Sequence, residues 1–247
     1  MEAAIDIEEL CVAYGDTVVL DGVDARINKG EIAVILGGSG CGKSTLLKTI
    51  IGLVPPRSGR VEILGFDAAD LDEETRPSLL VRLGVMFQYG ALLNSLTIAD
   101  NIALPLEMHT ELSSELIEAI VRTRLASVSL SHAYDLFPNE LSGGMRKRAA
   151  LARAMTLDPE ILFCDEPSAG LDPVTAAEID ELLLTLNREL GTTLVIVTHE
   201  LLSIGRLDGR LIMLDQGRVV FTGSVEQAHR SEHEIVYPFF HPGEQST

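Results

Sequence analysis

Residues 37–45 read Gly-Gly-Ser-Gly-Cys-Gly-Lys-Ser-Thr, and this stretch decides the fold class of the 247-residue chain. It fits the phosphate-binding pattern G-x-x-x-x-G-K-[ST], which requires a strand before it and a helix after it. Residues 31–36 end in a continuous apolar run that is typical of a strand buried on both faces. Residues 42–51 read as the helix. The stretch therefore predicts an α/β protein that binds a nucleotide.

The residue types of this loop suit a triphosphate. Glycines let consecutive backbone N–H groups converge on phosphate oxygens, and the N-terminus of the next helix adds positive potential. Lys43 is expected to bridge the β- and γ-phosphates, and the Ser44 hydroxyl to bind Mg²⁺. The alternative is an ordinary glycine turn, which the Lys-Ser-Thr sequence disfavours. The predicted nucleotide-binding residues of the loop are Gly37, Gly38, Ser39, Gly40, Cys41, Gly42, Lys43, Ser44 and Thr45.

A second apolar run, residues 161–164, ends in the acidic pair Asp165 and Glu166. Asp165 is expected to hold Mg²⁺ through water. Glu166 is expected to orient and polarise the attacking water as a general base. An isolated acidic pair at a strand end is usually just solvated, but the phosphate-binding loop upstream favours the catalytic interpretation.

Residues 141–146, Leu-Ser-Gly-Gly-Met-Arg, open a helical pattern that runs to about residue 155. Ser142 suits the N-cap, and the free N–H groups around Gly143 and Gly144 form an anion site with the helix dipole. The phosphate-binding loop already surrounds most of the triphosphate in its own subunit. This second anion site is therefore expected to act on a nucleotide held by another copy of the chain.

Three basic residues follow within the same helical pattern. Arg146, Lys147 and Arg148 are consecutive, so their side chains point in different directions. A solvated helix surface is the expected environment for all three, and contact with the other subunit is the alternative.

Three more residues gain a role from their order along the chain. Gln88 ends a predicted short strand and can contact Mg²⁺ or the attacking water, although a lone glutamine there would be a surface residue. His199 follows the predicted buried strand 194–197 and can reach the γ-phosphate, where a lone histidine would be a polar loop residue. Tyr14, before Gly15 in a predicted hairpin, is placed to stack on adenine or to pack on the core.

Composition narrows the classes of partner. Acidic residues number 37 against 19 basic ones, which gives a net charge of −18. This charge disfavours nucleic acid and anionic lipid headgroups as direct partners and permits a partner with a basic surface. A highly soluble acidic surface explains the charge equally well.

Apolar runs, the N-terminal residues and the cysteines together indicate where in the cell the chain is expected to be found. No run approaches the roughly 20 apolar residues that cross a bilayer. Residues 1–4 lack a basic and an apolar region of a signal peptide, so the chain is expected to stay where it is made. The widely spaced Cys11, Cys41 and Cys164 are expected to be free core or loop residues in a reducing, cytoplasmic setting.

Predicted strands and helices alternate along the chain, except for a mostly helical stretch over residues 94–157. A hairpin is expected around Gly15-Asp16, and Asp172-Pro173 is a strong helix start. The helical stretch is expected to carry one apolar stripe, made of Leu112, Leu116, Ile120 and Leu125. The predicted strands are 5–13, 18–27, 31–36, 60–64, 84–88, 161–164, 194–197, 211–214 and 218–222.

The ordered motifs resemble those of the ATP-binding subunits of ATP-binding-cassette (ABC) transporters. The resemblance runs from the first strand to beyond residue 200, on Lys43, Gln88, Ser142, Asp165-Glu166, Asp172 and His199. It implies a P-loop NTPase (RecA-like) fold with an antiparallel β subdomain and a helical subdomain over about 88–157. It also implies that residues 1–230 form the ATPase domain, that 231–247 form a tail, and that ATP with Mg²⁺ is sandwiched between two head-to-tail copies.

Residues 87–92 and 141–154 look similar to the ATPase of Mla-type, Mce-associated lipid transporters. Many ABC importers have glutamine in the place of Met145, and the methionine points to the Mla/Mce branch. Tyr89 and Ser129 depart from the pattern, where serine and glycine are frequent. The resemblance implies movement of phospholipid or another lipid between membranes, with an integral permease and a periplasmic Mce-domain protein. It implies a peripheral location on the cytoplasmic face of the inner membrane. A soluble ABC ATPase, such as that of iron–sulfur cluster assembly, is the alternative.

The C-terminal segment holds Tyr237, Phe239 and Phe240, three of eleven aromatic residues in the chain. Disordered termini seldom concentrate aromatic residues. This segment is therefore expected to dock on its own subunit or on a dimer mate.

Overall fold

The structure is a computed structural model that describes residues 2–73 and 75–243. The strands are β1 (Ala3–Tyr14), β2 (Thr17–Asn28), β3 (Ile32–Gly37), β4 (Ser58–Ile63), β5 (Phe66–Asp67), β6 (Leu83–Met86), β7 (Ile161–Asp165), β8 (Thr193–Val197), β9 (Arg210–Asp215) and β10 (Arg218–Gly223). The helices are α1 (Lys43–Ile50), α2 (Thr75–Leu80), α3 (Ile98–His109), α4 (Ser114–Ser127), α5 (Gly143–Ala154), α6 (Pro173–Leu190), α7 (Leu201–Leu207), α8 (Val225–His229) and α9 (Val236–Phe240), with short 3₁₀ turns at Ser131–Ala133 and Pro138–Glu140.

In the described part of the chain, the larger sheet has six strands in the order β10-β9-β3-β8-β7-β6. Every pairing from β9 to β6 is parallel, and β10 returns antiparallel to β9. The run of β3 alternates between two cores, with Ala33 and Ile35 on one face and Val34 and Leu36 on the other. Both faces are covered, which is why this strand reads as a continuous apolar run.

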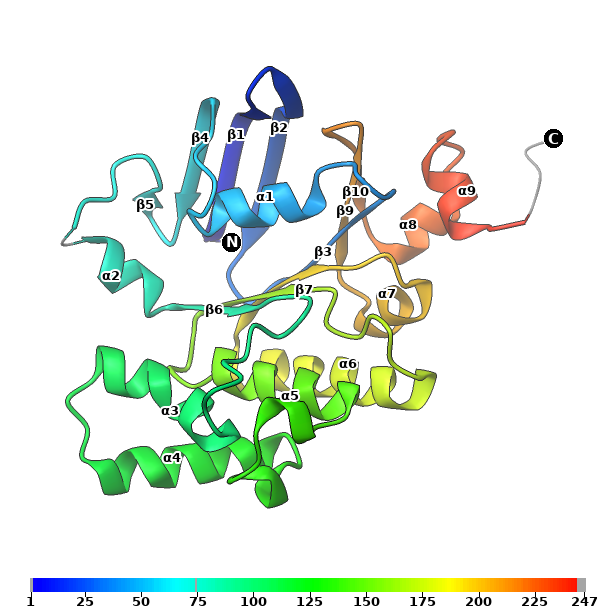
Figure 1. Ribbon diagram of the computed structural model, residues 1–247. Helices are drawn as coiled ribbons and strands as arrows, with labels where there is room; N and C mark the ends of the chain where they lie inside the picture. The colour runs from blue at the N-terminus through cyan, green and yellow to red at the C-terminus, as the bar shows by residue number, and fades with distance from the viewer. Residues whose placement is uncertain (1, 74, 244–247) are drawn as a thin grey trace.

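A four-stranded antiparallel sheet, β2-β1-β4-β5, lies over one face of the larger sheet (Figure 1). The β1–β2 hairpin closes where Tyr14 pairs with Thr17, and Gly15 takes a left-handed φ of 59° in its turn. Helix α1 lies between the two sheets and buries Leu46 and Leu47 against both. The predicted hairpin and the helix after the loop are thereby confirmed.

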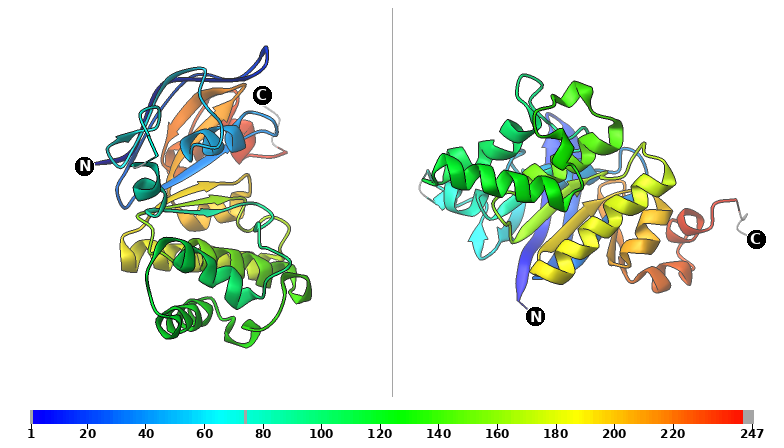
Figure 2. Two further views of the ribbon diagram at one scale, coloured as in Figure 1. Left: turned by 60° about the vertical axis from the view of Figure 1, so that its left-hand side comes forward. Right: turned by 90° about the horizontal axis from the view of Figure 1, so that it is seen from below.

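The opposite face of the larger sheet is covered by α5, α6 and α7. Helix α6 begins as predicted, because the Asp172 carboxylate accepts from the N–H groups of Val174 and Thr175 and Pro173 occupies the first turn. The views of Figure 2 place α8 and α9 at the side of the molecule away from α3 and α4.

The aromatic C-terminal segment docks on its own chain. Val236 and Phe240 of α9 are buried in the same core cluster as Ala228 of α8, and the Phe240 ring meets that of His229 edge-on. One of the two predicted docking modes is therefore present within a single copy.

Helices α3, α4 and α5 enclose a third apolar core. The predicted stripe on this region is wrong at three of its four positions, since Leu112 and Leu116 are exposed and Ile120 is only half-buried, outside the core cluster. Helix α4 begins only after Ser113, whose hydroxyl caps it, so Leu112 precedes the helix. The buried face then falls at i, i+4 and i+8, on Ile117, Val121 and Leu125.

Cys11, Cys41 and Cys164 are all free, as expected. Burial raises the pKa of the Cys164 thiol to about 12, so this side chain is a small apolar core residue at neutral pH. Among the described residues, no helix combines the length and the hydropathy required to cross a bilayer.

Candidate active site

The glycine loop between β3 and α1 is closely packed at both ends. At Gly37, φ is +144° and a Cβ would lie 2.1 Å from the carbonyl oxygen of Leu214. At Gly42, φ is +108° and a Cβ would lie 2.6 Å from a methyl carbon of Leu20. Glycine is required at these two positions by backbone conformation and by space.

The middle of the loop is open. Gly38, Ser39 and Gly40 are exposed, and a Cβ at either glycine would meet no atom of residues 2–73 or 75–243 within 4 Å. Gly42 caps α1 without a side-chain hydrogen bond, so the first-turn N–H groups, including that of Ser44, face the loop unsatisfied by a cap. A helix N-terminus of this kind binds anions such as phosphate.

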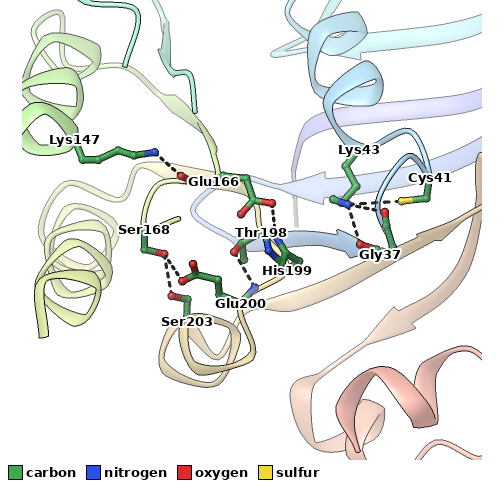
Figure 3. Close-up of polar contacts among 11 residues, drawn as sticks. Gly37, Cys41, Lys43, Lys147, Glu166, Ser168, Thr198, His199, Glu200 and Ser203 are labelled. Atoms are coloured by element: carbon green, nitrogen blue, oxygen red, sulfur yellow. Dashed lines mark hydrogen bonds and ion pairs between the residues drawn. The ribbon is translucent and has the colours of Figure 1, made fainter. Parts of the chain in front are cut away.

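Lys43 lies over this loop. Its Nζ atom donates to the carbonyl oxygens of Gly37 at 2.8 Å and Gly38 at 2.9 Å, and lies 3.9 Å from the Cys41 sulfur (Figure 3). Two backbone carbonyls thus hold the ammonium at the loop, and the Thr45 side chain is half-buried. A phosphate could replace these carbonyl partners.

Two carboxylates stand at the end of β7, both only 7% exposed. Within residues 2–73 and 75–243, Oδ1 of Asp165 and Oε2 of Glu166 are buried and have no hydrogen-bond partner. Burial, and next the charge of Glu166, raise the pKa of Asp165. A buried oxygen without a donor, such as Oδ1 of Asp165, fits a bound cation, because Mg²⁺ takes carboxylate and hydroxyl oxygens.

His199 meets the second carboxylate. Its Nδ1 atom lies 2.7 Å from Oε1 of Glu166, and its own side chain is 60% exposed (Figure 3). Thr198, directly before it, is buried at the end of β8. The imidazole thus contacts the carboxylate with one nitrogen and keeps an open face toward solvent.

The Glu166 backbone is unusual. Its φ of 49° is left-handed, and its N–H donates to the carbonyl oxygen of Val197 at 2.8 Å. Its own carbonyl oxygen accepts from Nζ of Lys147 at 2.7 Å, and the same ammonium donates to the carbonyl oxygen of Gln88. Gln88 itself is an exposed turn residue, since β6 ends two residues earlier than predicted, at Met86.

The expectation of a solvated basic surface is wrong for Lys147. This side chain is buried, and the loss of hydration lowers the pKa of its ammonium. Arg148 also turns inward to the Val128 carbonyl and to Glu178, whereas Arg146 is exposed. The burial of Lys147 was indicated by helical spacing, because Lys147 lies on the same helix face as Ala150 and Leu151, which are both fully buried.

The N-terminus of α5 is capped as predicted, with the Ser142 hydroxyl accepting from the Met145 N–H at 3.3 Å. Gly143 is exposed, and a Cβ at Gly144 would lie 2.6 Å from Cγ2 of Thr175. A surface pocket of about 540 Å³ opens here, lined in part by Ser142, Gly143 and Gly144. The residues that line it include none from the glycine loop 37–42.

Tyr14, at the tip of the hairpin, is 51% exposed. Its ring does not belong to the buried core clusters among the described residues. A ring in this position is open to a planar ligand.

Residues 20–169 match the ABC transporter family. The chain belongs to this family. The predicted resemblance and the fold class are thereby confirmed, and this ABC ATPase binds and hydrolyses ATP.

Proteins that are similar to this chain are named for the transport of different substrates. The chain is 38% identical to a probable ribonucleotide transport ATP-binding protein, mkl, of Mycobacterium tuberculosis, over 97% of this chain and 67% of that protein. It is 40% identical to the intermembrane phospholipid transport ATP-binding protein MlaF of Haemophilus influenzae, over 95% and 89%. It is 43% identical to the methionine import ATP-binding protein MetN of Xanthomonas oryzae pv. oryzae, over 85% and 62%.

Among solved structures, the ATP-binding cassette MJ0796 is similar, in a dimeric post-hydrolysis state with ADP and Pi. The TM-score is 0.83 at 32% identity, covering 90% of this chain and 98% of that one. The ABC ATPase fold is thus shared over nearly the whole of both chains.

Proposed function

We propose that this ABC ATPase powers the movement of phospholipid or another hydrophobic lipid between two membranes, through a separate integral permease. Support comes from the likeness to MlaF, which extends over most of both chains, and from Met145 in the Leu-Ser-Gly-Gly-Met motif. The subunit works at the cytoplasmic face of the inner membrane, and a periplasmic Mce-domain protein receives or supplies the lipid. Nucleic acid is not a partner.

In the catalytic step, Glu166 is the general base that polarises the attacking water. The observation that carries this assignment is the 2.7 Å contact between Oε1 of Glu166 and Nδ1 of His199. One carboxylate oxygen is thereby oriented, and the buried Oε2, without a donor among the described residues, is left to accept a water proton. His199 offers its exposed side to the γ-phosphate.

The triphosphate lies on the glycine loop, where the N–H groups of residues 37–45 and the α1 N-terminus bind its oxygens. Lys43 exchanges its carbonyl partners for the β- and γ-phosphates. Ser44, Asp165 and Gln88 would hold Mg²⁺, which neutralises phosphate charge when bound. Tyr14 stacks on the adenine.

Two copies complete two sites. The Ser142 hydroxyl and the N–H groups of Gly143 and Gly144 in one copy cap the triphosphate held by the other, because their pocket lies apart from the glycine loop of their own chain. ATP binding closes this homodimer, and the helical subdomain moves with the permease near residues 88–106.

Purification of the native membrane complex tests the transport proposal. The tagged full chain is captured in mild detergent, and its companion polypeptides and lipids are identified by mass spectrometry. An integral permease with an Mce-domain protein and bound lipid is expected, and lipid transfer in vesicles made from this complex should stop in Glu166→Gln. Capture of a soluble iron–sulfur scaffold, or of a permease that moves an amino acid or nucleotide, would overturn the proposal.

A further inference from the structure

Lys147 joins three parts of the molecule that are distant in sequence. It lies on α5, it is only 9% exposed, and its ammonium donates to the backbone carbonyls of Gln88 and Glu166. Figure 3 shows the side chain reaching from α5 to the loop after β7. A buried ammonium is retained only where it has partners, and both of these partners are backbone oxygens of residues that belong to the site.

Glu166 is the residue that most requires such support. A left-handed φ is uncommon for residues other than glycine, and it persists only when the surroundings hold it. The Val197 carbonyl fixes the peptide before the Glu166 Cα, and the Lys147 ammonium fixes the peptide after it. Together the two hydrogen bonds set the direction in which the carboxylate leaves the backbone, toward His199.

The same helix makes a second contact of this kind. Arg153, also on α5, donates to the carbonyl oxygens of Gly90 at 3.0 Å and Ala91 at 2.8 Å. Both cations therefore hold the loop after β6, but only Lys147 also reaches Glu166. A displacement of α5 relative to β7 would move the Lys147 ammonium away from one of its two carbonyls.

We propose that Lys147 is a positioning residue: it holds the backbone of Glu166 in the orientation that the general base requires, and it makes that orientation depend on the placement of α5. This inference rests on the proposed role of Glu166. It adds a residue that never touches ATP and that acts only through the Glu166 and Gln88 carbonyls. Arginine at this position could keep both hydrogen bonds, whereas methionine keeps the stem and loses every donor.

The experiment measures steady-state ATP hydrolysis by the full chain at varied ATP concentration, with nucleotide binding and thermal unfolding recorded for each variant. Lys147→Met is expected to lower kcat about tenfold or more while KM and ATP affinity change less than about twofold, since small misplacement of a catalytic group mainly slows chemistry. Lys147→Arg is expected to recover most of the loss. Arg153→Met, the matched control, loses loop contacts without touching Glu166 and should lose less turnover.

Three results would overturn the proposal: a Lys147→Met kcat within twofold of wild type, equal losses in Lys147→Met and Arg153→Met, or a loss shared by kcat and ATP affinity that arginine does not restore. Should Lys147→Met fail to fold, Lys147→Gln is tested in its place, since it keeps a neutral amide group with two N–H donors on a shorter side chain; it is judged by the same comparison of kcat with KM and ATP affinity. If that variant also fails to fold, the role is structural and the proposal is wrong. Glu166→Gln is run in parallel, because retained turnover there refutes the assigned base independently of Lys147.

Discussion

Glu166 and His199 leave two neighbouring parallel strands, and their side chains meet at 2.7 Å between Oε1 and Nδ1. Parallel pairing of β7 with β8 brings both C-terminal ends to one edge of the sheet, beside the loop that follows β3. Ligands of open α/β sheets bind at this edge. Backbone register thus assembles an acid–imidazole pair from positions 33 residues apart.

Substitution of the base gives the sharpest test of the site. Glu166→Gln keeps the shape but cannot take a proton, so turnover should fall by about 10²- to 10⁴-fold while ATP still binds. With ATP, the variant should accumulate a closed dimer that light scattering detects. Wild-type turnover in this variant would refute the assignment.

His199→Ala leaves Oε1 of Glu166 without its partner. Loss of a charged hydrogen bond that orients the base should lower kcat about 10- to 100-fold, with little change in ATP affinity. The matched control is His109→Ala at the exposed end of α3, which should turn over like wild type. Equal activity of the two variants would mean that His199 has no part in the reaction.

Gly144 is expected to tolerate no side chain while the Thr175 methyl group faces it. A Cβ there would lie 2.6 Å from Cγ2 of Thr175, so Gly144→Ala should displace the start of α5 and lower turnover at least about tenfold. Thr175→Ser removes that methyl group and keeps the hydroxyl that donates to Asp172 at 2.6 Å. The double variant should therefore regain activity, and a double variant as slow as Gly144→Ala would contradict the steric explanation.

Asp165→Asn should stabilise the nucleotide-free protein while abolishing hydrolysis. Burial raises the pKa of Asp165 above its ordinary 3.8, so the folded state binds this proton more tightly than the unfolded chain. Ionisation therefore lowers stability at neutral pH, and this penalty fades as pH falls through the folded pKa. In EDTA at pH 7.5 the Tm of the variant should be higher by about 2 °C or more, with a smaller difference in acid. An equal or lower Tm would contradict this.

Tyr14 should matter for ATP binding and not for chemistry. Stacking of a base on an aromatic ring contributes about 1–3 kcal/mol, so Tyr14→Ala should raise KM for ATP about tenfold with kcat nearly unchanged. Tyr14→Phe keeps the ring and should resemble wild type. A Tyr14→Ala variant with normal KM would show that the exposed ring does not meet the nucleotide.

Local patterns predicted most of the fold. The run before Gly37 predicted a strand covered on both faces, Asp172 with Pro173 predicted the start of α6, and Ser142 predicted the cap of α5. Each of these features depends on neighbours within a few residues, which a sequence displays directly. The placement of Asp165 and Glu166 at a strand end follows for the same reason.

Features that depend on packing between distant parts of the chain were harder to predict from the sequence. Lys147 reads as a surface residue because lysine is usually solvated, and only the fold supplies the carbonyls of Gln88 and Glu166. The predicted stripe is wrong at Leu112 because the Ser113 hydroxyl caps α4, so that the helix begins only after that residue. Likewise, nothing about glutamate as a residue type predicts the left-handed backbone conformation of Glu166.

Helix α5 belongs to two cores at once, with Ala149 and Ala152 among the helices α3 and α4, and Ala150 and Leu151 beneath the larger sheet. This double membership limits how the protein can be cut and recombined. A chimera that exchanged only residues 94–142 with another cassette would present a foreign surface to the alanine face. Functional grafts should therefore carry α5 with the donor segment and place the junction after Met155.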